Sequence, residues 1–143
     1  MNAIEFLINE HKSVKKTLED ISDSSHRFET KQKMFANLCA NLLRHEKMEH
    51  TVWYPHFKDS DKLDNTVKHL LIEEKSAENA IKAFDSIKTP EEWHIKFSKF
   101  KKDVVHHAQE EERDLFPQVK KILDEEQLNQ IGRDMSEFKK QYQ

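Results

Sequence analysis

The chain has 143 residues, of which 36% are charged, and its 24 basic residues nearly balance its 27 acidic ones. This balance excludes the concentrated basic surface that a nucleic-acid-binding protein needs, so we expect no nucleic-acid partner. No apolar run reaches the roughly 18 residues that span a bilayer, the lone Cys39 cannot form an internal disulfide, and no N-terminal signal pattern is visible, so we expect a cytoplasmic protein that does not act at a membrane.

The composition favours a single all-α domain over residues 1–143. One glycine and three prolines offer few turn-formers for a sheet, whereas helix formers such as Lys, Glu and Leu are plentiful. A chain of this length is most often one domain. We expect a four-helix bundle over about residues 2–117 and an additional short C-terminal helix over about residues 124–141.

Apolar residues recur at intervals of three and four in successive stretches, which predicts amphipathic helices. We expect these helices over about residues 2–24, 31–54, 63–87 and 90–117. The fourth begins at Thr89 and Pro90, a hydroxyl N-cap followed by a proline in the first turn, and Pro117 kinks it without ending it. Asp124 and Gln127 resemble a capping box that opens the C-terminal helix. Four long helices with short connections pack most simply as an up-down-up-down bundle.

The apolar face of the fourth helix contains two polar residues one turn apart, His107 and Glu111. The other members of this face are Phe97, Phe100, Val104 and Leu115. Burying an imidazole and a carboxylate costs several kcal/mol unless a partner charge or a metal compensates. The second helix repeats the pair as His45 and Glu49, and a proline follows each pair at the same offset. The repetition favours a function over an accident.

Seven polar residues interrupt the apolar faces of the four predicted helices. These candidate metal ligands are His11, His45, Glu49, Glu74, Glu78, His107 and Glu111. Counting the helical rise outward from each predicted turn brings them to a similar depth, so we expect one polar layer inside the bundle. Four buried carboxylates would repel one another, whereas two divalent cations would neutralise them.

Three imidazoles and four carboxylates suit iron or manganese and could accept zinc, and the set lacks the thiolates of a structural zinc site. Two ions are the natural count, with Glu49 and Glu111 as the candidates to bridge them. The remaining residues would be terminal ligands. They would leave an open position, where oxygen, peroxide or nitric oxide would bind.

The sequence resembles the hemerythrin-like, or HHE cation-binding, domain family over nearly its whole length. The motifs that carry the resemblance are Glu10-His11-x-x-Val14-Lys15, His45-x-x-x-Glu49-x-x-x-x-x-Pro55 and His107-x-x-x-Glu111-Glu112-x-x-Leu115-Phe116-Pro117. The resemblance implies a four-helix bundle around two iron ions, Fe²⁺ or Fe³⁺, with an oxo or hydroxo bridge. It implies ligand roles for His11, His45, Glu49, His107 and Glu111.

The third predicted helix departs from the family pattern. Glu78 stands where the family has a histidine, and Glu74 stands one turn earlier, where oxygen-carrying members have a second one. Carboxylates are harder and more negative donors than imidazoles and favour ferric iron. We therefore expect a poorer reversible oxygen carrier.

Several other polar and aromatic residues have a simpler interpretation. His106 and Glu110 lie one position off the apolar face, so we expect His106 in solvent or behind the ligands. We expect Trp53 and Tyr54 to cap the core. We expect surface positions for the remaining histidines, which are His26, His50, His56, His69 and His94.

The leading hypothesis is a non-haem di-iron protein that binds, senses or reduces oxygen, peroxide or nitric oxide, or that stores iron. Any catalysis would be at most a weak oxidase or peroxidase activity. The first alternative is a metal-responsive regulatory module, which a protein partner or a second copy of the chain would read through the C-terminal helix. The second alternative is a metal-free helical interaction module, whose thermal stability a chelator would leave unchanged.

Overall fold

The structure is a computed structural model that describes residues 1–142. Its α-helices are α1 (Ala3–Ile21), α2 (Phe28–Val52), α3 (Asp64–Ala83), α4 (Pro90–Glu110), α5 (Phe116–Ile122) and α6 (Glu125–Gln141). Short 3-10 turns, η1 (Tyr54–His56) and η2 (Phe84–Ser86), follow α2 and α3, and a π-helical turn, η3 (Glu111–Leu115), joins α4 to α5. No strand occurs within residues 1–142, so the predicted all-α class is confirmed.

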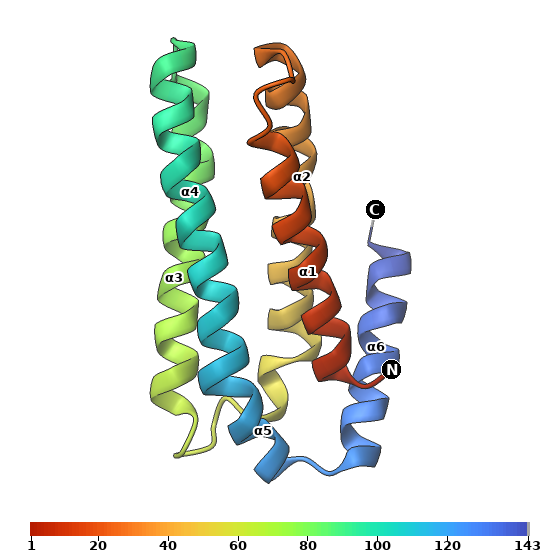
Figure 1. Ribbon diagram of the computed structural model, residues 1–143. Coiled ribbons are helices and arrows are strands. Elements are labelled where there is room, and N and C mark those ends of the chain that lie inside the picture. The colour runs from red at the N-terminus through yellow and green to blue at the C-terminus, as the bar shows by residue number, and fades with distance from the viewer. Residues whose placement is uncertain (143) are drawn as a thin grey trace.

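The helices form the predicted up-down-up-down bundle, in which α1 and α2 make one antiparallel pair and α3 and α4 make the other (Figure 1). The C-terminal helix, α6, runs along the outside of α1 and also contacts α2. Three helix ends differ from the predicted ones by three or four residues: α1 ends sooner, at Ile21, α2 begins earlier, at Phe28, and α3 ends sooner, at Ala83. Within residues 1–142, no helix is long and apolar enough to span a bilayer.

Side-chain caps explain where α4 and α6 begin. Thr89 Oγ1 accepts a hydrogen bond of 3.2 Å from the N–H of Glu92, and Pro90 occupies the first turn, as predicted. Asp124 and Gln127 form the predicted capping box, with reciprocal hydrogen bonds of 2.8 and 2.9 Å. Each cap satisfies N–H groups that the first helical turn leaves free, and such a cap contributes about 1 kcal/mol.

The kink predicted at Pro117 takes the form of the π-helical turn η3, in which the N–H of Phe116 donates to the carbonyl of Glu111. Proline has no N–H, so Pro117 cannot donate to the carbonyl of Arg113 as an α-helix requires, and its ring crowds that carbonyl. Widening the turn relieves this conflict. Helicity continues beyond it through α5, as predicted, and the candidate ligand Glu111 occupies the first position of the widened turn.

Two clusters of buried apolar side chains fill the bundle on either side of a polar layer. One is rich in aromatic rings and contains Leu18, Ile21, Phe35, Leu38, Cys39, Trp93, Phe97 and Phe100. The other extends to α6 and includes Leu7, Met48, Trp53, Leu115, Leu128, Ile131 and Met135. Full burial of one such side chain contributes about 1.5–3 kcal/mol. Along α1 the polar layer lies between Leu7 and Leu18, at the level of His11.

The N-terminal segment crosses α6 at Gly132, the single glycine of the chain. A Cβ atom at this position would overlap the carbonyl oxygen of Met1 and lie 2.9 Å from the carbonyl carbon of Asn2. The absence of a side chain therefore permits the close approach of the two segments. This contact holds α6 against the start of α1.

Candidate metal centre

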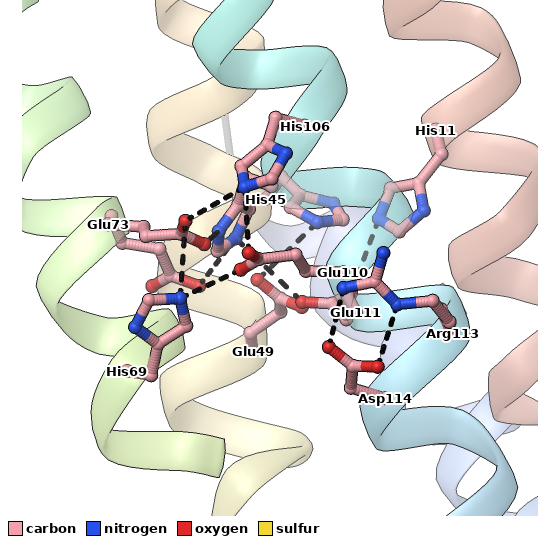
Figure 2. A network of polar contacts seen from close by, with 12 residues as sticks. His11, His45, Glu49, His69, Glu73, His106, Glu110, Glu111, Arg113 and Asp114 are labelled. Carbon is pink, nitrogen blue, oxygen red and sulfur yellow. Dashed lines mark hydrogen bonds and ion pairs between the residues drawn. The ribbon is translucent and has the colours of Figure 1, made fainter.

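Six of the seven predicted ligands converge in the polar layer, and Figure 2 labels His11, His45, Glu49 and Glu111 among them. They form two groups whose ligand atoms lie within 4.8 Å of one another. The groups are His11, His45 and Glu111, and Glu49, Glu74, His107 and Glu111. Glu111 belongs to both groups, and all four helices of the bundle contribute to the layer.

The structure does not bring the seventh predicted ligand, Glu78, into either group. It lies on α3 one turn beyond Glu74, about 6 Å farther along the helix axis, and its carboxylate accepts a hydrogen bond of 3.4 Å from Lys75. Glu74 is 3% exposed, whereas the side chain of Glu78 is 29% exposed. The contribution of α3 to the layer is therefore Glu74. The sequence pattern could not separate the two residues, because they lie on the same face of the helix.

The spacing of the two His-x-x-x-Glu pairs brings each imidazole toward its own carboxylate. His45 Nε2 lies 3.4 Å from Glu49 Oε1, and His107 Nε2 lies 3.9 Å from Glu111 Oε2. His11, from α1, completes the layer with its Nε2 3.2 Å from Glu111 Oε1. In all three imidazoles, the Nε2 atom is the one that faces the carboxylates of the layer.

Buried carboxylate oxygens without partners make this layer costly unless a cation is present. Glu49 and Glu111 are 0% exposed. Within the described residues, neither oxygen of Glu49 accepts a hydrogen bond, nor does Oε1 of Glu111, although imidazole nitrogens lie 3.4 and 3.2 Å away. A buried charge without full compensation costs several kcal/mol. A cation among these oxygens would supply the missing contacts.

The carboxylates of the layer differ in their ionisation. Burial, together with the charges of Glu111 and Glu74, raises the pKa of Glu49 well above its usual range. Burial also opposes the ionisation of Glu74, but hydrogen bonds from His107 and His50 outweigh it and lower the pKa of Glu74. In the metal-free protein, a proton in the layer therefore prefers Glu49 to Glu74.

Carboxylates in the metal-free layer raise the pKa of two of its imidazoles, His107 and His11. Burial lowers the pKa of His107, but its hydrogen bond to Glu74 and the charge of Glu111 outweigh burial and raise the pKa to about 9. Burial also lowers the pKa of His11, but its hydrogen bond to Glu111 and the charge of Glu111 outweigh burial and raise that pKa. Three imidazoles, three carboxylates and the unpartnered oxygens among them fit metal cations of the kind that accept mixed nitrogen and oxygen donors, such as iron, manganese or zinc.

Each of the three imidazoles also has a carboxylate on its outer nitrogen, Nδ1. The acceptors, at 2.7, 3.3 and 2.9 Å, are Glu112 for His11, Glu10 for His45 and Glu73 for His107. Such a carboxylate fixes the orientation and the tautomer of the ring and leaves Nε2 free to bind a cation. Helical periodicity gave none of these three acids a role, although Glu10 and Glu112 stand in the family motifs and each acid is the immediate neighbour of a predicted ligand.

Two further residues that the sequence analysis placed elsewhere contact Glu74. Tyr54 is buried, as expected of a residue that caps the core, but its hydroxyl donates to Glu74 at 2.8 Å and lies 3.4 Å from Glu111. His50 is half exposed, and its Nε2 donates to Glu74 at 2.8 Å. Tyr54 follows the end of α2, so helical periodicity did not predict the direction of its side chain.

Two cavities border the polar layer. One, of about 280 Å³, is lined by Glu49, Glu74 and His107 together with apolar side chains. The other, of about 340 Å³, is lined by His11 and His45 and again by apolar side chains. Charged side chains line both cavities as well, and volumes of this size lie at the lower end of the range for small-molecule pockets.

Comparison with known proteins gives two matches. The family model of the hemerythrin HHE cation binding domain matches residues 2–119, which include every predicted ligand. Among solved structures, the chain is similar to the crystal structure of a hemerythrin HHE cation binding domain-containing protein from Mycobacterium kansasii, with 24% sequence identity and a TM-score of 0.86. That match covers 99% of this chain and 87% of the other, and it is a likeness of fold. No curated protein matches the chain significantly.

Proposed function

Because the family model covers most of the chain, the protein belongs to the hemerythrin HHE cation-binding domain family and binds metal cations, and we propose that it holds two iron ions that bind or reduce a small ligand such as oxygen, peroxide or nitric oxide. The iron ligands in this proposal are His11, His45, Glu49, Glu74, His107 and Glu111. The observation that carries the proposal is the sharing of Glu111 between two groups of donor atoms.

The arrangement of the donors supports two cations rather than one. One group offers two imidazoles and Glu111, and the other offers one imidazole, Glu49, Glu74 and Glu111. A carboxylate has two oxygens, so Glu111 can contact one cation with each of them. Glu49, whose two oxygens both lack a hydrogen-bond partner among the described residues, is the second candidate bridge.

Iron ions bound in this layer would supply one-electron redox chemistry and open positions for a small ligand. The protein orients the donors: the acids on the outer nitrogens hold the three imidazoles, and the hydroxyl of Tyr54 holds Glu74. The same hydroxyl keeps a proton 2.8 Å from that carboxylate, inside the layer. The two cavities provide room for a small ligand beside the layer.

The carboxylate that α3 contributes favours the oxidised metal. Glu74 adds negative charge and a hard oxygen donor where an imidazole would add neither, and ferric iron prefers such donors to a greater degree than ferrous iron. We therefore propose reaction with oxygen or peroxide, or retention of iron, in preference to reversible oxygen carriage.

Metal analysis of the purified protein, with anomalous scattering measured above and below the iron edge, tests the identity and the number of the ions. Anaerobic loading with two equivalents of Fe²⁺, followed by air, tests the chemistry. We expect about two irons per chain and new charge-transfer absorption in the near ultraviolet. Fewer than one iron per chain, or a flat spectrum with two irons bound, would contradict the proposal.

A matched pair of variants separates the layer from the general effect of removing a carboxylate. Glu111→Gln removes the donor shared by both groups and should reduce iron binding at both positions. Glu126→Gln makes the same change at an exposed position in the first turn of α6 and should leave the iron content and the spectrum unchanged. Equal loss of iron in both variants would count against the assignment of Glu111.

A second candidate function, a metal-responsive regulatory module, has one specific observation in its favour. Glu10 links the layer to α6, because its Oε1 accepts a hydrogen bond of 3.3 Å from His45 Nδ1 and its Oε2 accepts one of 2.7 Å from Lys139 Nζ. A change of charge at the metal would alter the pull on Glu10 and, through it, the anchoring of α6. A protein partner or a second copy of the chain that binds α6 would then respond to the metal.

Hydrogen exchange over residues 124–142 distinguishes the regulatory module from a protein whose metal chemistry stays within the bundle. The regulatory function requires a difference in protection between the ferrous and the ferric protein, and Lys139→Gln should remove that difference. Equal protection of α6 in the two oxidation states would exclude the regulatory function.

A further inference from the structure

We propose that a second cation site lies on the surface beside the buried layer, formed by His69 and Glu73 of α3 and His106 and Glu110 of α4, and that it binds one divalent cation of the first transition row. We call these four residues the rim cluster. Figure 2 shows the four side chains facing one another where α3 and α4 lie side by side.

The rim cluster consists of two more His-x-x-x-Glu pairs, one on each helix. The spacing puts His69 and Glu73 on one face of α3, and His106 and Glu110 on one face of α4. The two faces meet, and the ligand atoms of His69, Glu73 and Glu110 lie within 4.8 Å of one another. His106 joins them through a contact of 2.7 Å between its Nε2 and Glu110 Oε1.

The separations between the donor atoms suit a cation. His69 Nε2 lies 2.9 Å from Glu110 Oε2 and 3.5 Å from Glu73 Oε2, and the distance from His106 Nε2 to the same oxygen of Glu73 is 3.8 Å. Donors at 2.0–2.1 Å from a tetrahedral zinc ion are separated by about 3.4 Å. The donors of His69, Glu73 and Glu110 can therefore close around one ion, and His106, which lies outside this group of three, would join it through a side-chain movement.

Hydrogen bonds alone satisfy this arrangement incompletely. A ring nitrogen carries at most one proton, yet the Nε2 of His69 and the Nε2 of His106 each face both carboxylates. A cation in place of those protons would contact both imidazoles and both carboxylates. It would also separate two negative charges that now face each other across a short distance. The mixed nitrogen and oxygen donors favour Zn²⁺ or Fe²⁺ over Mg²⁺ or Ca²⁺, which prefer oxygen.

The rim cluster is distinct from the buried layer but shares a border with it. The side chains of His69 and His106 are each 58% exposed, so a cation there would exchange with solvent and keep water ligands. Glu73 faces both places, because its Oε2 belongs to the rim cluster and its Oε1 accepts a hydrogen bond of 2.9 Å from His107 Nδ1. The cavity of about 280 Å³ that borders the layer is lined by Glu73 and His106 as well.

Counting Zn²⁺ ions bound to the metal-stripped protein tests the proposal. The wild-type protein should bind one ion more than His69→Ala/His106→Ala, as measured by calorimetric titration and by metal analysis after gel filtration. His56→Ala/His94→Ala removes two exposed imidazoles elsewhere and should keep the wild-type count. Equal counts for the wild type and for the His69/His106 variant would overturn the proposal, as would the same loss in the control.

A second variant keeps this test independent of the buried layer and of folding. Glu49→Gln/Glu111→Gln disables the layer and should still bind one Zn²⁺, with shifts of the imidazole resonances of His69 and His106. If the layer fails to bind iron, the Zn²⁺ ion at the rim should still be bound. If this variant binds no Zn²⁺, the rim site is overturned and the proposal for the layer is unaffected. Should the double alanine variant lose its helical circular dichroism, His69→Gln/His106→Gln would replace it in the same count.

Discussion

The buried layer and the rim cluster are built from the same unit, a histidine and a glutamate one helical turn apart, but they differ in their access to water. In the layer, Glu49 and Glu111 are 0% exposed, and carboxylate oxygens lack hydrogen-bond partners within the described residues. In the rim cluster, both histidines are 58% exposed. Water solvates the rim histidines, whereas the layer excludes it, so a cation compensates a larger energetic deficit in the layer than at the rim.

This difference separates two consequences of binding a metal. A cation in the layer should stabilise the fold, because the unfolded chain has no assembled site and the metal-free layer holds carboxylates together inside the bundle. A cation at the rim, where the histidines are exposed to water, should bind more weakly and stabilise the fold less at the same cation concentration.

Removal of the metal should have the largest effect. With free cation at about 1,000 times its dissociation constant, binding at one site of the folded state adds about 4 kcal/mol to the free energy of unfolding. For a domain of this size, that corresponds to a rise in Tm of about 12 °C. Thermal unfolding of stripped and reloaded protein, followed by circular dichroism, measures it. Identical Tm values for the two forms would favour the metal-free interaction module.

Glu49→Gln should separate metal binding from the stability of the metal-free protein. Burial and neighbouring charges already raise the pKa of Glu49 well above its usual range, so the neutral amide resembles the protonated carboxyl and should change the metal-free unfolding free energy by less than about 1 kcal/mol. Metal affinity should fall by at least about 100-fold, the upper end of what the loss of a supporting residue costs.

Leu38→Ala should have the reverse effects of Glu49→Gln, since it should lower stability and leave metal binding unchanged. Leu38 is 2% exposed in the aromatic cluster, so its truncation should cost about 2–5 kcal/mol of stability. It should leave the number of bound ions unchanged. Denaturant titrations of both stripped variants, together with metal analysis, check the pair. A large loss of metal-free stability in Glu49→Gln would mean that its carboxylate has a structural partner.

Metal affinity of the layer should fall as the pH falls. The pKa of His107 is about 9 in the metal-free protein, so below pH 9 a cation must displace a proton from this imidazole. Affinity should therefore rise tenfold per pH unit up to about pH 9 through this group alone, which makes about 100-fold between pH 6 and pH 8. Competition with a chelator at several pH values measures the slope. A constant affinity between pH 6 and pH 8 would show that metal binding does not displace a proton from His107.

The helices and most of the buried layer could be predicted from the sequence, because burial of a whole helix face imposes a period of three and four on its residues. A polar residue within that period is conspicuous, and this identified the six residues that converge. Glu78 has the same period as Glu74 but lies one turn away, and separating them required the depth at which α3 faces the other helices. Tyr54 and the π-helical turn depend on how the chain leaves a helix or passes a proline, which periodicity does not describe.

The rim cluster was hidden from the sequence for a different reason. His69 and His106 lie off the apolar faces, so a pattern of burial classifies both as solvent-exposed, and each is indeed exposed. Their meeting depends on the rotation of α3 against α4, which brings two polar faces together at the bundle surface. A search for every His-x-x-x-Glu pair, irrespective of face, would have found the four residues.

Glu73 joins the two regions, and its substitution should have an intermediate effect. Glu73→Gln weakens the acceptor that holds His107 Nδ1, so metal affinity in the layer should fall by about tenfold without loss of an ion from the layer. Glu78→Gln, on the same helix, is the matched control and should leave the affinity unchanged because Glu78 lies outside both groups. An equal or greater loss in Glu78→Gln would instead support Glu78 as a ligand. Metal competition assays on the two variants decide between these outcomes.

The smallest effect should come from removing the rim imidazoles. His69→Ala/His106→Ala breaks ion pairs whose histidine side chains are more than half exposed, and exposed pairs contribute little because water and salt screen them. The metal-free unfolding free energy should change by less than about 1 kcal/mol. Denaturant titration at low and at high salt measures this change, which should shrink further at high salt. A larger loss would mean that the rim cluster, like the layer, supports the packing of α3 against α4, and the contrast between the two regions would then be one of degree.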